Sequence, residues 1–225
     1  MSRLFVAVVL SLALAPAGAQ LDRITNQDAK AGLKAALEKG SQVAVASLGR
    51  PDGFLGNNAV KIQLPDSLKR YEKLMRQVGM GKYADELVVT MNRAAEAAVP
   101  EARALFVDAV KKMSVQDAKA ILTGGDTAGT EYFKRTTSEP LRAKFVPIVS
   151  QATKRVQVAE KYNEFAGKGA KFGLLKKEDA NLDGYITQKA LDGLFYMVGE
   201  EEKRIRANPV QAGNDLLKRV FGAIR

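Results

Sequence analysis

Four side chains near the middle of the chain, Tyr132, Lys134, Arg135 and Arg142, come closest to forming a binding site by residue type and spacing. Three are cations and the fourth carries a phenolic hydroxyl. Arginine and lysine donate charge-assisted hydrogen bonds to carboxylates and phosphates. The cluster therefore predicts a site for an anionic ligand. The structural alternative is that Tyr132 packs inward and Arg135 pairs with a neighbouring glutamate.

The run Gly124–Thr130 (GGDTAGT) lies immediately before this cluster. Two glycines ahead of a helix can present backbone N–H groups to an anion, and Thr127 and Thr130 would add hydroxyl donors. No lysine follows at the spacing of a P-loop, and Asp126 would repel a phosphate. The same residues suit a plain helix–helix connection, with a glycine ending one helix and Asp126 or Thr127 capping the next. We expect the connection rather than the nucleotide site.

Asp126 and Glu131 are the first carboxylate pair to consider for acid/base catalysis. That role requires a cleft holding both groups, with at least one carboxyl pKa raised by burial. The chain contains no histidine and no cysteine, which excludes imidazole bases, thiol nucleophiles and zinc–thiolate sites. The composition favours a role without catalysis and indicates no cofactor. A carboxylate-based enzyme of the cell envelope remains the alternative.

A calcium-loop pattern occurs at 179–187 (DANLDGYIT). Asp179, Asn181 and Asp183 stand at the first, third and fifth positions of an EF-hand loop, and a glycine follows at the sixth. The twelfth position, which needs a bidentate glutamate, is Ala190. The structural alternative is that Asn181 or Asp183 caps the helix that follows. Calcium binding through a degenerate loop is thus a further alternative function.

The N-terminal segment 1–19 has the features of a secretory signal peptide. Arg3 supplies the positive charge, an apolar run follows at 4–15, and small residues precede a cleavage site near Ala19-Gln20. The apolar run is too short to span a bilayer, and no later stretch of the mature chain is long and apolar enough to do so. We expect a periplasmic or secreted protein after cleavage.

The chain is basic, with 35 Lys and Arg against 25 Asp and Glu and a net charge of +10. This balance favours anionic partners such as lipid head groups, acidic polysaccharide or nucleic acid. The charges are spread along the chain rather than clustered, so a solubilising surface explains much of the excess. The lack of tryptophan and of interleaved aromatic and basic residues argues against nucleic acid. The expected partner is an anionic ligand or envelope component of unspecified identity.

Residues 20–225 are expected to form one all-α domain of eight or nine helices of uneven length around one core. Apolar residues recur at three- to four-residue spacing through most of the chain, and Gly, Pro or Ser/Thr clusters interrupt them. We predict breaks after Leu48, at 79–81, at 136–138, and a kink or break near Pro147. The predicted helices are 21–48, 66–78, 82–99, 101–113, 115–122, 128–135, 139–165, 181–207 and 210–221.

Two connections have distinctive local patterns. Val60, Ile62 and Leu64 alternate with polar residues, which could mean a short strand, but without a partner strand we expect an extended segment laid over the core. Ser114 and Asp117 form a capping box with aspartate in place of glutamate or glutamine.

Three segments carry a resemblance to a known family: 47–57 (SLGRPDGFLGN), 124–137 (GGDTAGTEYFKRTT) and 186–209 (ITQKALDGLFYMVGEEEKRIRANP). With them, the chain resembles the exported helical proteins of Gram-negative bacteria grouped as domain of unknown function 4197. The resemblance covers essentially all of the chain after the signal peptide. It implies an all-α envelope protein and weakens the calcium hypothesis. It brings no known activity, cofactor or catalytic residue, so no functional role is transferred to any position.

Overall fold

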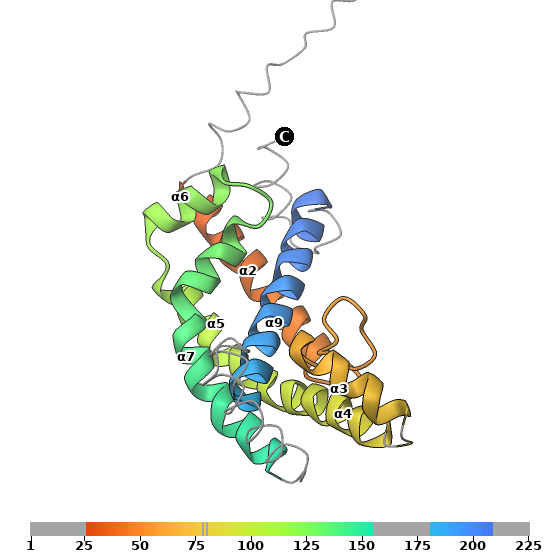
Figure 1. Ribbon diagram of the computed structural model, residues 1–225. Helices are drawn as coiled ribbons and strands as arrows, with labels where there is room; N and C mark the ends of the chain where they lie inside the picture. Colours follow the sequence, from red (N-terminus) through yellow and green to blue (C-terminus); the bar gives the residue numbers. More distant parts are fainter. Residues whose placement is uncertain (1–25, 78, 80, 155–180, 209–225) are drawn as a thin grey trace, which may run out of the picture.

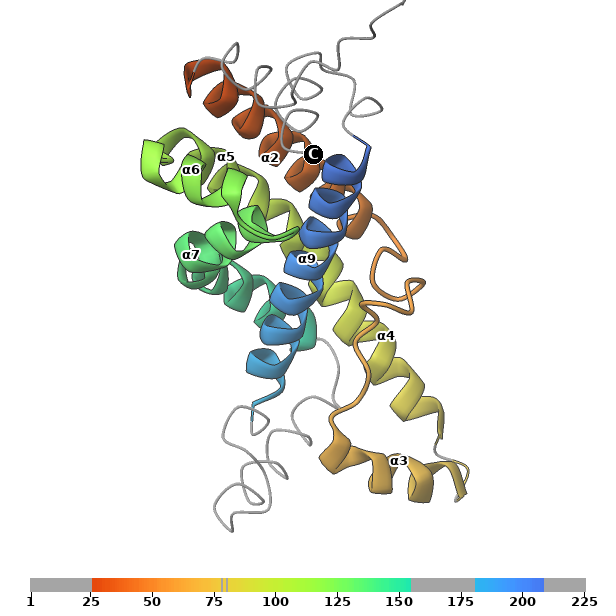
Figure 2. The same cartoon turned by 90° about the horizontal axis from the view of Figure 1, so that it is seen from above.

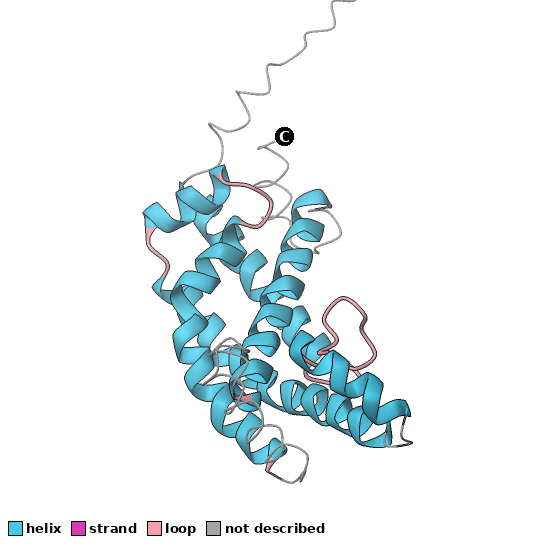
Figure 3. Cartoon of the chain, in the orientation of Figure 1, coloured by secondary structure: helices cyan, strands magenta, loops and turns pink. Residues whose placement is uncertain are grey.

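The computed structural model describes residues 26–77, 79, 81–154 and 181–208. Every regular element in these ranges is helical (Figure 3), which confirms the predicted all-α class. The elements in chain order are α2 (Asn26–Leu48), α3 (Asp66–Gln77), α4 (Gly81–Ala98), the short 3₁₀ helix η1 (Val99–Glu101), α5 (Ala102–Lys112), α6 (Val115–Thr123), α7 (Ala128–Thr153) and α9 (Leu182–Ala207).

The described part of the chain contains fewer helices than the eight or nine predicted, chiefly because α7 is continuous. The break expected at 136–138 does not occur. The hydroxyls of Thr136, Thr137 and Ser138 each donate to the carbonyl four residues earlier, at 2.8, 2.6 and 2.6 Å. These bonds satisfy the polar side chains inside the helix, so the cluster does not interrupt it. The helix predicted at 210–221 lies outside the described residues.

α7 also continues through Pro140 and Pro147, so of the kink or break predicted near Pro147 the break does not occur. A proline removes one intrahelical hydrogen bond and leaves the carbonyl four residues earlier without its N–H partner. Both prolines lie on exposed positions of the helix, where water can reach the affected turns. α7 curves along its course while remaining one helix (Figure 1).

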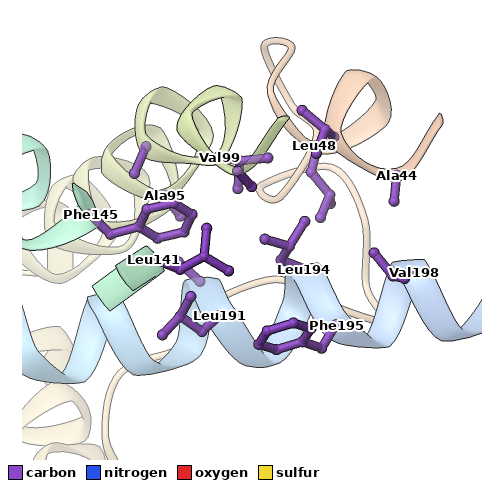
Figure 4. Close-up of a cluster of buried hydrophobic side chains, with 14 of the residues drawn as sticks. Ala44, Leu48, Ala95, Val99, Leu141, Phe145, Leu191, Leu194, Phe195 and Val198 are labelled. Carbon is purple, nitrogen blue, oxygen red and sulfur yellow. The ribbon is translucent and has the colours of Figure 1, made fainter. Parts of the chain in front are cut away.

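One continuous apolar core joins these helices, and α9 packs against α2, α4 and α7 within it. In Figure 4, Leu194 and Val198 of α9 lie near Leu48 and Ala44 of α2. The neighbouring part of the same cluster is formed by side chains from α4, η1, α7 and α9, namely Ala95, Val99, Leu141, Phe145, Leu191 and Phe195.

Residues 49–65 join α2 to α3 and are held against α4 by two buried polar side chains. Glu96 accepts hydrogen bonds from the N–H groups of Phe54 and Leu55 at 3.0 and 3.2 Å. Asn92 accepts the Ile62 N–H and donates to the Ile62 carbonyl, both at 2.9 Å. The prediction of a segment laid over the core is confirmed, since its alternating apolar side chains are buried: Val60, Ile62 and Leu64.

α3 and α4 form the predicted hairpin, whose turn projects from the other helices, while the C-terminal part of α4 packs in the core against α7 and α9 (Figures 1 and 2). Gly79, in the turn, has a φ of +78°, a conformation that favours glycine. Arg76 of α3 pairs with Glu72 in its own helix at 2.9 Å and with Asp85 of α4 at 2.5 Å. These ion pairs hold α3 against α4. Asp66, the first residue of α3, also lines a cleft beside α9.

Candidate functional site

The N-terminus of α7, where the sequence suggested an anion nest, holds a carboxylate that belongs to the protein itself. Glu202 of α9 accepts the N–H groups of Gly129 and Thr130 at 2.9 and 2.8 Å, and the Thr130 hydroxyl at 2.8 Å. The cap expected from Asp126 or Thr127 is absent: Thr127 is the capping position but its side chain makes no capping bond, and Asp126 is exposed. The connection prediction stands, with a tertiary cap instead of a local one.

Arg206 completes this arrangement. Its guanidinium donates to Glu202 at 2.8 Å and to the Ile121 carbonyl of α6 at 2.9 Å, and only 12% of its side chain is exposed. A Cβ added at Gly129 would lie 2.4 Å from Leu37 and 3.0 Å from the Glu202 carboxylate, so any larger residue would have to displace the Leu37 side chain. The GGDTAGT run therefore joins α6, α7 and α9 and has no free N-terminus to offer a ligand.

Tyr132 and Arg135, two of the four predicted site residues, face α5 and α6. The buried Tyr132 hydroxyl donates to the Ala109 carbonyl at 2.7 Å, and burial raises the pKa of this phenol. Arg135 lies 5.5 Å from the centre of the Tyr132 ring and pairs with Asp117 at 2.9 Å. Both side chains are used in packing α7 against α5 and α6, as the structural alternative anticipated, although the partner of Arg135 is Asp117 rather than a glutamate of its own helix.

Lys134 and Arg142, the other two, lie on the side of α7 that faces α9. Their eight-residue separation in one continuous helix places them on a common stripe. They line a hollow of about 520 Å³ between the two helices. Lys134 pairs with Glu131 at 2.7 Å, and Arg142 donates a hydrogen bond to Gln188 of α9. The structure thus divides the predicted cluster into two pairs. Tyr132 and Arg135 line a smaller hollow of about 380 Å³ beside α6, whereas Lys134 and Arg142 line the hollow that faces α9.

A larger open cleft of about 1150 Å³ adjoins that hollow, between residues 59–66 and the outward face of α9 (Figure 2 shows the two segments side by side). The two spaces share the lining residues Arg142, Gln188, Asp192 and Tyr196. We call them together the α9 groove. Gln188 links Arg142 to Asp192 by donating to the aspartate at 2.8 Å.

Cations outnumber carboxylates around the larger cleft. Its charged lining consists of the cations Lys61, Lys69, Arg142 and Lys189 and the carboxylates Asp66 and Asp192. Lys69 pairs with Asp66 at 2.7 Å, and this hydrogen bond and charge lower the pKa of the Asp66 carboxyl. The Lys189 ammonium lies 5.7 Å from the centre of the Tyr185 ring, whose hydroxyl donates to the Gln63 carbonyl at 3.0 Å.

Sequence reasoning missed Lys61, Lys69, Lys189 and Tyr196, because they come from three separate segments. One local signal was available: Gln188, Asp192 and Tyr196 recur every four residues and form a polar stripe along α9. Tyr196 is 48% exposed, which is unusual for an aromatic ring on a helix that is otherwise deeply packed. That stripe marks the outward face of α9, but nothing in the sequence indicates which segments stand beside it.

One known protein family matches nearly the whole chain. The model of the family described as protein of unknown function (DUF4197) matches residues 23–222. The chain belongs to the DUF4197 family. The resemblance inferred from the three segments is thereby confirmed. No curated protein and no solved structure matches the chain.

The segments that carry the DUF4197 resemblance have structural roles in the described residues. Residues 47–57 contain the turn held by Glu96. The 124–137 run contains the start of α7, which Glu202 caps. Residues 186–207 form most of α9, with both its buried face and the stripe that lines the groove. Among the described helices of this DUF4197 protein, none is long and apolar enough to cross a membrane.

The carboxylate pair considered for catalysis in this DUF4197 chain lacks the cleft that the hypothesis required. Asp126 and Glu131 are both exposed, and Glu131 is paired with Lys134 at 2.7 Å. Asp126 lines neither part of the α9 groove. The requirement for two carboxylates enclosed together is therefore not met by this pair.

The calcium-loop residues fall partly outside the described part of the DUF4197 chain, since Asp179 is not among the described residues. Asn181 caps α9 by accepting the N–H groups of Asp183 and Gly184 at 2.9 and 3.3 Å. Asp183 accepts the Thr153 hydroxyl at 2.6 Å. The helix-capping alternative is thus present at Asn181, and within the described ranges no three acidic side chains come together as a metal site would require.

Proposed function

We propose that this protein is a non-catalytic binding module of the bacterial cell envelope and that it takes an anionic ligand in the α9 groove. The observation that carries the proposal is the lining of the larger cleft, where four cations and two carboxylates surround an open space. A cleft lined by an excess of one charge raises the local concentration of ligands of the opposite charge. The overall net charge of +10 acts in the same direction.

Arg142 is the residue we assign to the centre of the binding site. It lines both parts of the groove, so it can contact a ligand that occupies either of them. A guanidinium has five N–H donors, and the hydrogen bond to Gln188 uses one of them while orienting the group. The planar fork suits bidentate recognition of a carboxylate or phosphate. Lys134 and Lys189 stand on either side as additional cations.

This proposal narrows the site predicted from the sequence. Of the four residues in that cluster, Lys134 and Arg142 remain in the site, whereas Tyr132 and Arg135 are assigned to packing. The absence of histidine and cysteine from the chain and the exposure of the Asp126 and Glu131 carboxylates support a role in binding without catalysis.

The proposed location is the periplasm or the outside of the cell. It rests on the charge at Arg3, the apolar run at 4–15 and the small residues before Gln20. In that location anionic groups are available on lipids, polysaccharides and proteins, which is why the ligand class has to be decided from the groove itself.

The test uses inorganic polyphosphate, a flexible polyanion without rings, titrated into the purified protein by calorimetry at physiological salt. A variant combining Arg142→Ala and Lys189→Ala should lower the affinity by at least about tenfold, because two charge-assisted contacts are lost. The matched control combines Arg135→Ala and Lys112→Ala, which removes the same charge outside the groove. We expect less than about a threefold change for the control, by screening at a distance. Equal losses in both variants, or no binding by the native protein, would overturn the proposal.

A further inference from the structure

We infer that the ligand of the α9 groove is an acidic polysaccharide, a chain of sugar rings that carry carboxylate groups. The inference rests on the proposed function, because it names the ligand class of the same site. It is argued from the length of the groove, the exposed aromatic ring beside it, the mixture of hydrogen-bonding groups and the lack of apolar anchor pockets.

The length of the groove suits a polymer. Its two parts follow α9 from Gly184 to Lys203, which corresponds to about 28 Å along a helix that rises ~1.5 Å per residue. Their volumes, about 1150 and 520 Å³, together exceed the several hundred Å³ usual for a small-molecule pocket. Both parts are open to solvent along the surface, so a chain can enter and leave without being threaded.

Tyr196 offers a flat apolar surface where the two parts of the groove meet. It lines both of them, and 48% of the residue is exposed. An aromatic side chain with one wet face and a polar tip can pack its ring against the C–H face of a sugar while its hydroxyl bonds to water or ligand. The other tyrosine of the cleft, Tyr185, is engaged with Lys189 and Gln63, which leaves Tyr196 as the platform.

The polar groups beside Tyr196 match a ligand that has both hydroxyls and carboxylates. Arg142 and Lys189 are donors only and suit carboxylates, whereas Asp192 is an acceptor only and suits hydroxyls. Gln188 can serve as either partner. A polymer bearing only dense negative charge would offer Asp192 no hydrogen-bond donor, and a neutral polysaccharide would leave the cations without an anionic partner. A uronate chain, with one carboxylate and several hydroxyls on each ring, uses both kinds of group.

The groove lacks the apolar pockets through which peptides are usually anchored. Specific peptide binding relies on pockets that receive alternate or spaced side chains. The aliphatic residues that line the larger cleft, Val60, Ile62 and Leu64, are buried in the core at 8%, 2% and 6% exposure. On the α7 side, Leu191 and Phe195 are buried as well. The larger aliphatic and aromatic side chains of the lining are therefore mostly covered, and Tyr196 presents an exposed ring, which favours a sugar polymer over an acidic peptide.

The experiment compares short polygalacturonate chains with polyglutamate of the same number of carboxylates, at one ionic strength. We expect the native protein to bind polygalacturonate at least about tenfold more tightly, because only the sugar chain combines a ring face for Tyr196 with hydroxyl donors for Asp192. Tyr196→Ala should weaken polygalacturonate about fivefold and leave polyphosphate unchanged, and Tyr196→Phe should retain most of the affinity since it keeps the ring. Tyr196 is exposed, so these variants should unfold thermally like the native protein.

The possible failures are distinguishable. If polyglutamate binds as tightly as polygalacturonate and both depend on Arg142, the anion-binding function stands and the polysaccharide class is wrong. If Tyr196→Ala weakens polyphosphate as much as polygalacturonate, or weakens neither, the platform role is wrong and the inference falls. If no anionic polymer binds in a manner that depends on Arg142 and Lys189, the proposed function itself falls and takes the inference with it.

Discussion

The carboxylate of Glu202 on α9 accepts the backbone N–H of Thr130 on α7 at 2.8 Å, across 72 residues of sequence. The same carboxylate accepts the Gly129 N–H and the Thr130 hydroxyl, and it pairs with Arg206 at 2.8 Å. A negative group at a helix N-terminus satisfies donors that the helix leaves unpaired and interacts favourably with the helix dipole. This cap fixes the position of the α7 N-terminus relative to α9. The smaller hollow of the groove lies between these two helices, so its shape depends on the same cap.

Replacing Glu202 should therefore destabilise the whole fold. Glu202→Ala leaves the Arg206 guanidinium, whose side chain is 12% exposed, without its carboxylate, and it also removes the acceptor of two helix N–H groups. Breaking a buried ion pair from one side costs about 3 to 5 kcal/mol. Urea unfolding followed by far-UV circular dichroism measures the change in free energy of unfolding.

Glu200→Ala is the matched control on the same helix. Glu200 pairs with Lys203 at 2.8 Å, but 43% and 51% of the two side chains are exposed. Exposed pairs contribute little, so we expect a change below about 1 kcal/mol. Comparable losses of unfolding free energy in Glu202→Ala and Glu200→Ala would contradict the stabilising role of the buried Glu202–Arg206 pair.

The wall of the larger cleft depends on Asn92. Its amide accepts the Ile62 N–H and donates to the Ile62 carbonyl, and the residue is fully buried. Asn92→Asp keeps the shape, loses both donors and places a carboxylate in the core, so we expect a loss of about 2 to 4 kcal/mol. Hydrogen exchange should show faster exchange of the Ile62 amide. Asn58→Asp, exposed in the same segment, should leave that amide protected.

Much of the fold follows from local patterns in the sequence, because those patterns act within a few residues. The Ser114–Asp117 capping box is present at the start of α6, and a glycine turn joins α3 to α4 as predicted. The continuity of α7 could not be predicted in the same way. Whether Thr136 and its neighbours break a helix or bond back into it depends on whether the helix is supported from outside, and Glu202 supplies that support from far along the chain.

The sequence also did not show which neighbouring helices each residue of the central cluster faces. In one continuous helix, Lys134 and Arg142 face α9 while Tyr132 and Arg135 face α5 and α6. The rest of the groove comes from 59–66 and α9, and no spacing rule connects positions separated by more than a hundred residues.

The buried Thr187 hydroxyl of α9 is the site of a substitution that should stabilise the protein. Thr187 is 0% exposed, and the described residues provide no hydrogen-bond partner for its Oγ1. Thr187→Val has nearly the same shape and removes an unsatisfied polar atom, so the free energy of unfolding should rise by about 1 kcal/mol. Thr130→Val, which loses the bond to Glu202, should lower it by about 1 to 2 kcal/mol. A lower free energy of unfolding in both variants would contradict the conclusion that the Thr187 hydroxyl is unsatisfied.

The expected export can be tested independently of the fold. Expressed in a Gram-negative host, the protein should be recovered from the periplasmic fraction with Gln20 as its N-terminal residue, as read by intact mass. Substituting Val8→Asp and Val9→Asp interrupts the apolar run and should retain the full-length chain inside the cell. Recovery of the full-length native chain from the cytoplasm would contradict both the cleavage site and the proposed location.

The capping box at α6 should make part of the stability depend on pH. The Ser114 hydroxyl bond, with further contributions from the Ser114 N–H and Arg135, lowers the pKa of the Asp117 carboxyl below its ordinary value of 3.8. Because the folded-state pKa is the lower one, the ionised group stabilises the fold above about pH 4, and this contribution is lost as the pH falls through the folded-state pKa.

Asp117→Asn should therefore lower the free energy of unfolding by about 1 kcal/mol near pH 7, the usual contribution of a helix cap. The difference from the native protein should shrink steadily below pH 4, because the native carboxyl is then protonated in both states. Urea unfolding at a series of pH values between 2.5 and 7 measures this difference directly. Lys111, in the last turn of α5 and outside the capping box, serves for the control Lys111→Gln, whose effect should change little between pH 7 and pH 2.5. A difference for Asp117→Asn that is equally large at both ends of the range would mean that the cap does not depend on the charge of Asp117.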